Sequence, residues 1–337
     1  MDKIDQFEQR LVDKNNKPEV IQVIMNTLHD YKKFLDIKQK SIKEGSTKDF
    51  YEFSEKLIDQ GKNSFLAFQG LLSFGNFANI PLLSKLGMEV IDGSEVMENF
   101  SNRLIEEFGE VLRNEIFIDT NLPELGILPQ KKTEYTKILI NRLVEKLDVE
   151  MCTKFLSKGL RDRYEEFRKP HRKKFVELEN IDKFLEWRFN SFIKELEKHR
   201  DEGKIFFTQE INDEAVDYVK NNPNRLEGGI RKGNIIYETK VPNEIINYLH
   251  TEDDQLKAYY YCHCPWAKES IKDGTSHEIP TVFCNCSGGY YKAYWEIVLE
   301  QPVQVELLKS VLKGDSYCQF ALTIPSQFIK SQDKVKI

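Results

Sequence analysis

The sequence has no excess of positive charge. Its 49 Lys and Arg residues are outnumbered by 55 Asp and Glu residues, which gives a formal net charge of -6 and a pI near 5.7. A protein that binds nucleic acid needs clustered Lys and Arg to neutralise phosphates. The one basic run, RKPHRKK at residues 168–174, is short and has no interleaved aromatic residues, and we interpret it as a solvated stretch at the start of a helix. The composition therefore argues against a nucleic-acid partner.

The chain also lacks an uninterrupted apolar segment. Its most apolar stretch, SFLAFQGLLSFGNFANIPLL at residues 64–83, contains Gln69, Asn76 and Pro81. These residues would place polar groups and a break inside the hydrocarbon of a membrane, so we expect a buried helix hairpin or the wall of an apolar pocket instead. The first residues, MDKIDQFEQR, contain no apolar signal-peptide segment, which predicts a cytoplasmic protein.

Cysteine is sparse, with six residues in a chain of 337. In a reducing compartment, so few cysteines favour metal binding, catalysis or simple burial over disulfides. Cys152 has no other cysteine near it in the sequence, and we expect it to be a buried thiol. The other five lie in three motifs: YYYCHCPW with Cys262 and Cys264, FCNCSGG with Cys284 and Cys286, and GDSYC with Cys318.

The hydrophobic pattern changes near residue 200. Up to that point apolar residues recur at helical spacing, as at Ile24, Leu28, Tyr31 and Leu35, with Pro- and Gly-containing breaks such as FRKP before His171. This pattern predicts a bundle of six to eight helices. Beyond it, short alternating segments and turns predict an antiparallel sheet. We therefore expect an α+β fold with a helical domain at 1–200 and an α+β domain at 201–337, two domains being usual for this length.

Several elements of the second part can be placed in advance. Residues 212–222 predict a helix with Asn212 near its N-cap, and residues 288–301 predict another helix. The segment KIFF at 204–207 and the aromatic segment KAYYYC at 257–262 predict strands. Residues 228–242 predict a hairpin that turns at 232–234, and residues 303–324 predict two strands joined by the turn KGDS.

The two Cys-x-Cys pairs suggest a ligand set for a metal ion. In an extended segment, residues two apart share a face, so Cys262 and Cys264 would point together, with His263 opposite. We expect a helix after each pair, with Pro265 in the first helical position after the first pair, and a helix N-terminus favours the thiolate form of a nearby cysteine. Three interpretations stay open: zinc ligands, a metal-free thiolate site and buried thiols. The candidate ligands for zinc are Cys262, Cys264, Cys284, Cys286 and Cys318.

Aromatic residues are concentrated around the same motifs. Rings with one polar atom can line a pocket for a flat small molecule, but they can equally form the core beneath a sheet. The sequence favours neither interpretation over the other. The candidate pocket residues are Tyr261, Trp266, Tyr290, Tyr294 and Trp295.

The cysteine motifs carry a resemblance. YYYCHCPW, FCNCSGGYYKAYWE and LLKSVLKGDSYCQFALTIP, preceded by EGGIRKGNIIYETKVP, resemble an uncharacterised bacterial family with a domain of unknown function. The ending KGDSYCQFALTIP is similar to that of 4-vinyl reductase domains and of L-2-amino-thiazoline-4-carboxylate hydrolases. The first likeness implies a small-molecule-sensing domain with cysteine-bound zinc, involving Cys318 and Cys284 or Cys286. The second implies a hydrolase of a cyclic amidine with Cys318 as its essential cysteine.

From these observations we expect a cytoplasmic small-molecule-binding protein with a cysteine-ligated zinc ion in its C-terminal domain. A hydrolase is one alternative, with Cys318, one of the paired cysteines or a zinc-activated water attacking a C–N or C–S substrate. A thiol or iron–sulfur redox protein is another, and we rank the cluster below zinc as a cofactor. The sequence gives neither the ligand nor the oligomeric state.

Overall fold

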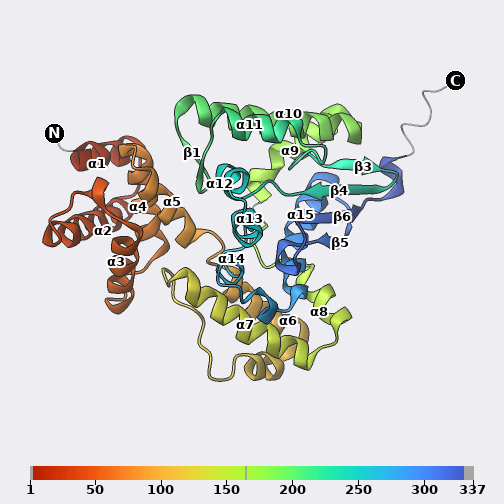
Figure 1. Cartoon of the computed structure of the whole chain (residues 1–337), viewed down its shortest axis with the longest axis horizontal. Coiled ribbons are helices and arrows are strands. Elements are labelled where there is room, and N and C mark those ends of the chain that lie inside the picture. The colour runs from red at the N-terminus through yellow and green to blue at the C-terminus, as the bar shows by residue number, and fades with distance from the viewer. Residues whose placement is uncertain (1–2, 164, 330–337) are drawn as a thin grey trace. The chain divides into compact units, whose positions relative to one another are not determined.

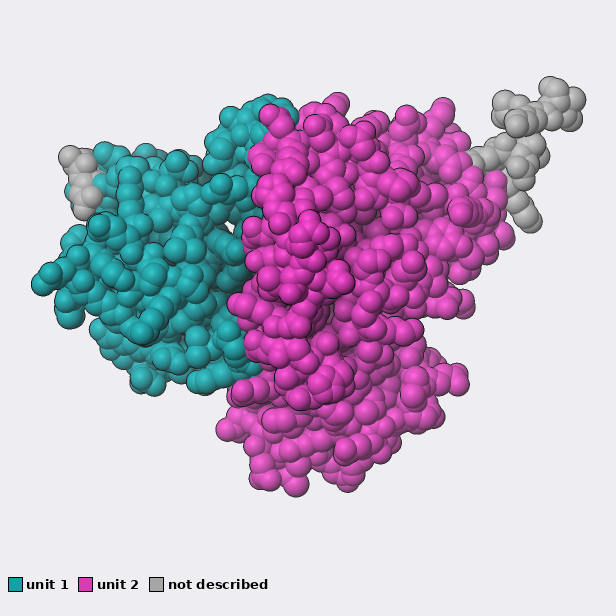
Figure 2. Space-filling model, viewed as in Figure 1, with its two compact units in different colours: residues 1–94, 122–132, 199–211 teal, residues 95–121, 133–198, 212–337 magenta. Residues whose placement is uncertain are grey.

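The computed structural model describes residues 3–163 and 165–329 (Figure 1). These residues form two compact units (Figure 2), each assembled from separate stretches of chain. The first unit takes residues from Met1–Ser94, Leu122–Lys132 and His199–Ile211, and the second from Glu95–Asn121, Thr133–Lys198 and Asn212–Ile337. The expected boundary near residue 200 is the point where the sequence pattern changes from helical to strand spacing. The two units are divided differently, because each takes three separate stretches of the chain.

The first unit is mainly helical. Apolar side chains from its helices form one core that includes Leu28, Phe50, Phe68 and Leu83. A two-stranded antiparallel ribbon, β1 (Ile205–Phe206) with β2 (Gln209–Glu210), belongs to the same unit. Its helices are α1 (Lys3–Asp13), α2 (Pro18–Ile37), η1 (Ile42–Glu44), α3 (Thr47–Asp59), α4 (Phe65–Ala78) and α5 (Pro81–Ile91).

The apolar stretch at 64–83 forms a helix hairpin, as predicted. Helix α4 ends where Asn79 adopts a left-handed conformation (φ 56°), and α5 begins at Pro81, which needs no backbone N–H in the first turn. The two helices approach closely at Gly75, where a Cβ atom would lie 2.7 Å from the backbone nitrogen of Ser84. Among the described residues, no helix is both long and apolar enough to cross a membrane.

The prediction of six to eight helices before residue 200 was too low. The described residues up to Glu202 form ten α-helices, because short connections such as that at Asn79 separate helices that the apolar pattern runs together. The break expected before His171 was also wrong, since Pro170 lies inside a helix. The remaining helices of this part are α6 (Val96–Ile116), α7 (Pro129–Lys146), α8 (Val149–Leu156), α9 (Glu165–Leu178) and α10 (Ile181–Glu202).

The second unit contains a four-stranded antiparallel sheet with the order β3-β4-β6-β5. The strands are β3 (Ile230–Lys232), β4 (Ile235–Thr239), β5 (Gln304–Lys309) and β6 (Gln319–Thr323). Helix α15 (Asn285–Leu299) packs on this sheet (Figure 1), and its Trp295 lies fully buried in a core with Phe184, Ile236 and Phe320. The helical and antiparallel parts together confirm the predicted α+β class.

Most predicted elements of this region are confirmed, and one is wrong. The 228–242 hairpin, the pairing of the last two strands and the helix capped by Asn212, α11 (Asp213–Asn221), are all present. Residues 257–262 were predicted as a strand, but they end helix α13 (Asp254–Tyr261), which is capped by Asp253. The other helical segments are α12 (Ile245–His250), α14 (Lys268–Lys272), η2 (Ser276–Glu278), η3 (Thr281–Cys284), η4 (Val311–Lys313) and η5 (Ser326–Phe328).

Candidate functional site

The five cysteines of the three motifs lie at the ends of elements. Cys262 directly follows α13, and Cys264 lies two residues further on. Cys284 ends η3 and Cys286 lies in the first turn of α15, while Cys318 directly precedes β6. Neither pair lies in a strand, and the expected extended segment with shared faces is wrong for the second pair, whose residues lie in η3 and α15. Pro265 is also not the first residue of a helix, because α14 begins at Lys268.

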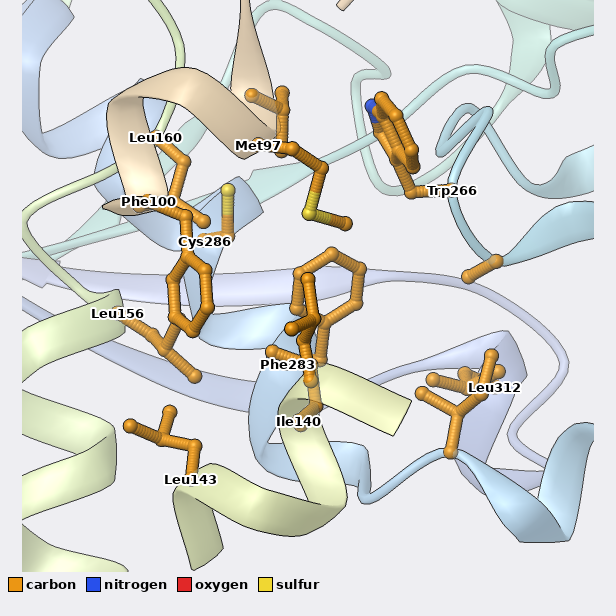
Figure 3. Close-up of a cluster of buried hydrophobic side chains, with 14 of the residues drawn as sticks. Met97, Phe100, Ile140, Leu143, Leu156, Leu160, Trp266, Phe283, Cys286 and Leu312 are labelled. Carbon is orange, nitrogen blue, oxygen red and sulfur yellow. The ribbon is translucent and has the colours of Figure 1, made fainter. Parts of the chain in front are cut away.

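The fold nevertheless brings these five side chains together. Cys318 lies close enough to raise the pKa of Cys262 and of Cys284. Cys264 lies close enough to raise the pKa of Cys286 and of Cys318. All five pack in one hydrophobic core, together with side chains from α6, α7 and α8. Figure 3 shows Cys286 among residues of that core that include Met97, Phe100 and Leu160. We call Cys262, Cys264, Cys284, Cys286 and Cys318 the five-thiol cluster.

Burial dominates the acidity of these thiols. It raises the pKa of Cys262 and of Cys286 to about 11 and that of Cys264 to about 12. It also raises the pKa of Cys284 well above its ordinary value and that of Cys318 above its ordinary value. Burial has this effect because it disfavours the charged form. With pKa values raised in this way, the five thiols keep their protons at neutral pH unless a strong positive charge lies among them.

Each sulfur of the five-thiol cluster nevertheless faces a hydrogen-bond donor. Ser310 donates its hydroxyl to Cys284 at 3.0 Å between Oγ and Sγ. At the other four, a backbone hydrogen bond lowers the pKa, an effect that requires a donor and therefore an N–H group. The donors are Cys264 for Cys262, Trp266 for Cys264, Leu160 for Cys286 and Val311 for Cys318.

Cys152 provides a contrast within the same core. It is fully buried, as predicted for an isolated thiol. Its sulfur lies 3.6 Å from the carbonyl oxygen of Leu147 and 3.9 Å from that of Leu143, and it acts as a donor to both. Carbonyl oxygens suit a neutral S–H group, and burial raises the pKa of Cys152, although a backbone hydrogen bond lowers it as at four thiols of the cluster. Cys152 is therefore placed as a structural thiol.

The GDSYC motif supports the five-thiol cluster through its turn. Gly314 has a left-handed conformation (φ 96°) at the end of η4, which fits its predicted role as a turn residue. The carboxylate of Asp315 accepts the backbone N–H of Ser310 at 2.8 Å. Ser310 is buried and is the residue that donates to Cys284. The turn thus fixes the hydroxyl group that faces one of the sulfurs.

Two cations lie near the five-thiol cluster. Lys240, the residue after β4, lowers the pKa of Cys262, Cys264, Cys286 and Cys318, and its Nζ donates to Ser287 Oγ at 3.2 Å. Arg161 lowers the pKa of Cys264 and Cys286. Sequence reasoning missed Lys240, Arg161 and Ser310, because none of them lies within a Cys-x-Cys motif.

The side chains are not arranged around a single ion. Within residues 3–163 and 165–329, no group of three or more His, Cys, Asp or Glu side chains has the arrangement of a metal site. His263, which was left out of the predicted ligands, places Nε2 at 2.6 Å from the carbonyl oxygen of Val241, so that nitrogen is a donor. The donor chemistry of the five-thiol cluster suits a thiophilic ion, but its thiols would have to turn toward a common point to bind one.

The five aromatic candidates have different surroundings. Tyr261 and Trp266 are buried in the core that contains the five-thiol cluster, and the Tyr261 hydroxyl donates to the carbonyl oxygen of Lys240. Tyr294 and Trp295 lie in the other core of the second unit, under the sheet. Tyr290 is 43% exposed. These rings therefore do not share one core, and a common ligand pocket stays a prediction.

A buried charged network lies beside Trp295. Glu238 on β4 is fully buried and accepts hydrogen bonds from Arg188 and from Trp295 Nε1, the latter at 2.7 Å. Burial opposes the charge of Arg188, but the Glu238 carboxylate raises the pKa of the guanidinium. Burial also raises the pKa of Glu227, whose carboxyl group accepts the Tyr291 hydroxyl at 2.9 Å. No sequence pattern indicates this network, because its members are widely separated along the chain.

The interpretation of residues 168–174 as a solvated run was wrong in part. Arg168 is only 5% exposed, and Arg172 donates to the carbonyl oxygen of Val298 at 2.8 Å. His171 places Nδ1 at 2.7 Å from the Tyr294 hydroxyl, and burial followed by the charges of Arg188 and Arg168 lowers its pKa to about 4. Since α9 packs against α15, this face of the basic run is turned toward aromatic side chains.

Comparison with known proteins adds one family. No curated protein matches the chain, and no solved structure matches it. The similarity of the GDSYC ending to 4-vinyl reductase domains is not confirmed. Residues 239–329, which contain the whole five-thiol cluster, match the model of a family of unknown function (DUF6144), so this part of the chain carries a domain of an uncharacterised family.

Proposed function

We propose that the protein is a cytoplasmic small-molecule-binding protein in which the five-thiol cluster binds a thiophilic metal ion, zinc first of all. One observation carries the proposal: the fold packs the five cysteines of three separate motifs into one core, where Ser310 donates its hydroxyl to Cys284 Sγ at 3.0 Å. Donors directed at sulfur stabilise a metal-bound thiolate and orient it.

The charges near the five-thiol cluster support the same proposal. Thiolates bind metal only after losing their protons, and burial alone opposes this loss. Lys240 acts on four of the five thiols in the direction that favours the thiolate. A bound zinc ion would supply the larger positive charge. Structural zinc takes four ligands, so one of the five thiols would stay outside its coordination sphere.

The hydrolase alternative receives less support. A cysteine nucleophile reacts as the thiolate, and burial raises the pKa of Cys318. Helix N-termini were expected to lower the pKa of the paired cysteines, but burial has the larger effect at all four. An iron–sulfur cluster uses the same thiolate ligands and is distinguished from zinc by the elemental content of the protein.

Elemental analysis with a thiol count on anaerobically purified full-length protein tests the proposal. We expect about one zinc ion per chain, in line with the four ligands of a closed structural site. Five variants, each with one thiol of the five-thiol cluster replaced by Ser, should separate four ligands from one non-ligand. Cys152→Ser is the matched control, because it removes a buried thiol of the same core, and it should keep its zinc.

Other results would decide against zinc. Iron together with inorganic sulfide would replace zinc by a cluster. The absence of both metals with six freely reacting thiols would overturn the proposal. Loss of zinc from Cys152→Ser to the same extent as from Cys284→Ser would show that metal content follows the stability of the core and not ligation.

A further inference from the structure

The guanidinium of Arg168 is buried without a hydrogen-bond partner. Its side chain on α9 is 5% exposed, and both Nη1 and Nη2 lack a partner within the part of the chain that the structure describes. Buried charges are normally paired, because an unpaired charge loses its hydration without compensation. Arg172, one turn later on the same helix, bonds to the carbonyl oxygen of Val298 and to Glu300. The lack of a partner therefore distinguishes Arg168 from Arg172 on the same helix.

Aromatic rings hold this guanidinium in place. Its Cζ atom lies 4.6 Å from the centroid of the Tyr290 ring and 6.0 Å from that of Tyr294. A guanidinium over a ring face keeps its N–H groups free, because they point outward in the plane of the fork. Two neighbouring Nη atoms can then donate side by side to an anion with two oxygens.

The surrounding acidic groups are engaged with partners other than Arg168. Arg188 is the second guanidinium near Tyr294, and it is neutralised by Glu238. His171 lies beside the same ring, and its lowered pKa makes it neutral at pH 7. Glu227 acts on Arg188 and bonds to Tyr291. Among these groups the guanidinium of Arg168 is the cation whose Nη atoms have no hydrogen-bonded anion in the described residues, so an anionic ligand would supply the partner.

We propose that Arg168 is the anchor of a binding site for the carboxylate group of a small organic molecule, which the two Nη atoms would hold through paired hydrogen bonds. The planar carboxylate matches the planar fork of the two Nη atoms, and the neighbouring rings of Tyr290 and Tyr294 suit an organic acid, which is why the carboxylate is favoured. Tyr290 covers the guanidinium, and its ring is 43% exposed at the surface. Rotation of this one side chain would open the site to a ligand. The site goes beyond the proposed metal function and does not depend on it.

Calorimetric titration of the full-length protein with sodium benzoate, at fixed ionic strength, tests the site. Benzoate offers the carboxylate together with a flat ring for the aromatic side chains. The Arg168→Met variant keeps the apolar stem but removes the guanidinium. It should weaken benzoate binding by about tenfold or more, since hydrogen bonds to charged groups are among the strongest in proteins. Arg172→Met is the matched control, because its guanidinium is already bonded, and it should bind benzoate as the wild type does.

The results that would overturn the site are specific. Equal benzoate affinity in the wild type and Arg168→Met, or no heat of binding in the wild type, would remove Arg168 as an anchor. Binding of inorganic phosphate but not of benzoate would replace the carboxylate by a phosphate. Because a substitution at Arg168 can disturb folding, the melting temperature of each variant is measured without ligand. The Tyr290→Ala variant leaves Arg168 in place and uncovers its guanidinium, so it should bind benzoate at least as tightly as the wild type. Benzoate binding retained in Cys284→Ser would separate this site from the metal proposal.

Discussion

Arg188 and Glu238 form an ion pair in which both side chains are nearly or fully buried. The pair is held by aromatic contacts, with the Arg188 Cζ atom 4.6 Å from the centroid of the Tyr294 ring. One carboxylate oxygen, Glu238 Oε2, has no hydrogen-bond partner in the described residues. Such a pair contributes little net stability, but the loss of one partner leaves an uncompensated charge in the core.

The Arg188→Met variant should therefore lose about 3–5 kcal/mol of the free energy of unfolding. Urea denaturation followed by circular dichroism measures this loss. Arg188→Met combined with Glu238→Gln should recover a large part of it, because the second change removes the unpaired charge. A single variant as stable as the wild type would show that the pair does not need both partners.

His171 makes stability depend on pH. Its pKa is lowered from 6.5 to about 4 in the folded protein, first by burial and then by the charges of Arg188 and Arg168. The unfolded chain therefore binds more protons than the folded one between these values, and the contribution of His171 to stability falls as the pH falls from 6.5 to 4. The free energy of unfolding of His171→Asn should have a shallower slope in this range. Equal slopes for both proteins, measured by urea denaturation, would contradict this prediction.

At the scale of elements, the α4–α5 hairpin depends on a close approach that only glycine permits. A Cβ atom at Gly75 would meet the Ser84 backbone nitrogen at 2.7 Å and the Leu83 carbonyl carbon at 3.2 Å. Backbone atoms cannot move aside as a flexible side chain does, so the two helices would have to separate.

The Gly75→Ala variant should lower the free energy of unfolding by about 1–3 kcal/mol, the usual cost of overpacking, although alanine favours helices. Gln69→Ala, at an exposed position of the same helix, serves as the control and should have little effect. Chemical denaturation of both variants makes the comparison. Unchanged stability of Gly75→Ala would show that the hairpin can open without cost.

Local signals account for the elements that could be predicted. Asn212 caps α11 through its side chain, and Gly233 supplies the left-handed turn between β3 and β4. The prediction for residues 257–262 was wrong because it followed the strand propensity of the tyrosines and ignored a helix cap. Asp253 accepts the backbone N–H of Leu256 and starts a helix. A single capping residue thus outweighed the propensity of an aromatic run.

The candidate site could be predicted only where its members share a motif. The five thiols were selected from the sequence because Cys-x-Cys pairs are visible as patterns. Lys240, Arg161 and Ser310 were not, because their proximity to the thiols depends on tertiary contacts between distant segments. We predicted that Arg168 is exposed to solvent, because charged residues usually are. Only the packing of α9 against α15 shows that its side chain is buried.

At the scale of the whole molecule, the two units have separate hydrophobic cores. The core of α1–α5 contains residues of the first unit, whereas the five-thiol cluster lies in a core of the second. Removal of zinc by a chelator should therefore increase amide hydrogen exchange in α13, the start of α15 and β6, and leave α2 and α4 unchanged. Exchange measured by mass spectrometry tests this. The metal-deficient Cys284→Ser variant should show no further response to the chelator, and a uniform increase across both units would contradict the prediction.

The spacing of the five-thiol cluster along the chain also sets an order of events during synthesis. Helices α6, α7 and α8, which supply Phe100, Leu143 and Phe155 to the core around the thiols, leave the ribosome well before Cys318 and β6. Because domains fold as their parts are made, α6 and α8 can pack first through Phe100 and Phe155, and Tyr261, Trp266 and Phe283 join the same core afterwards. The inner strand β6 and the last thiol therefore arrive together, after the other four thiols are already available to the core.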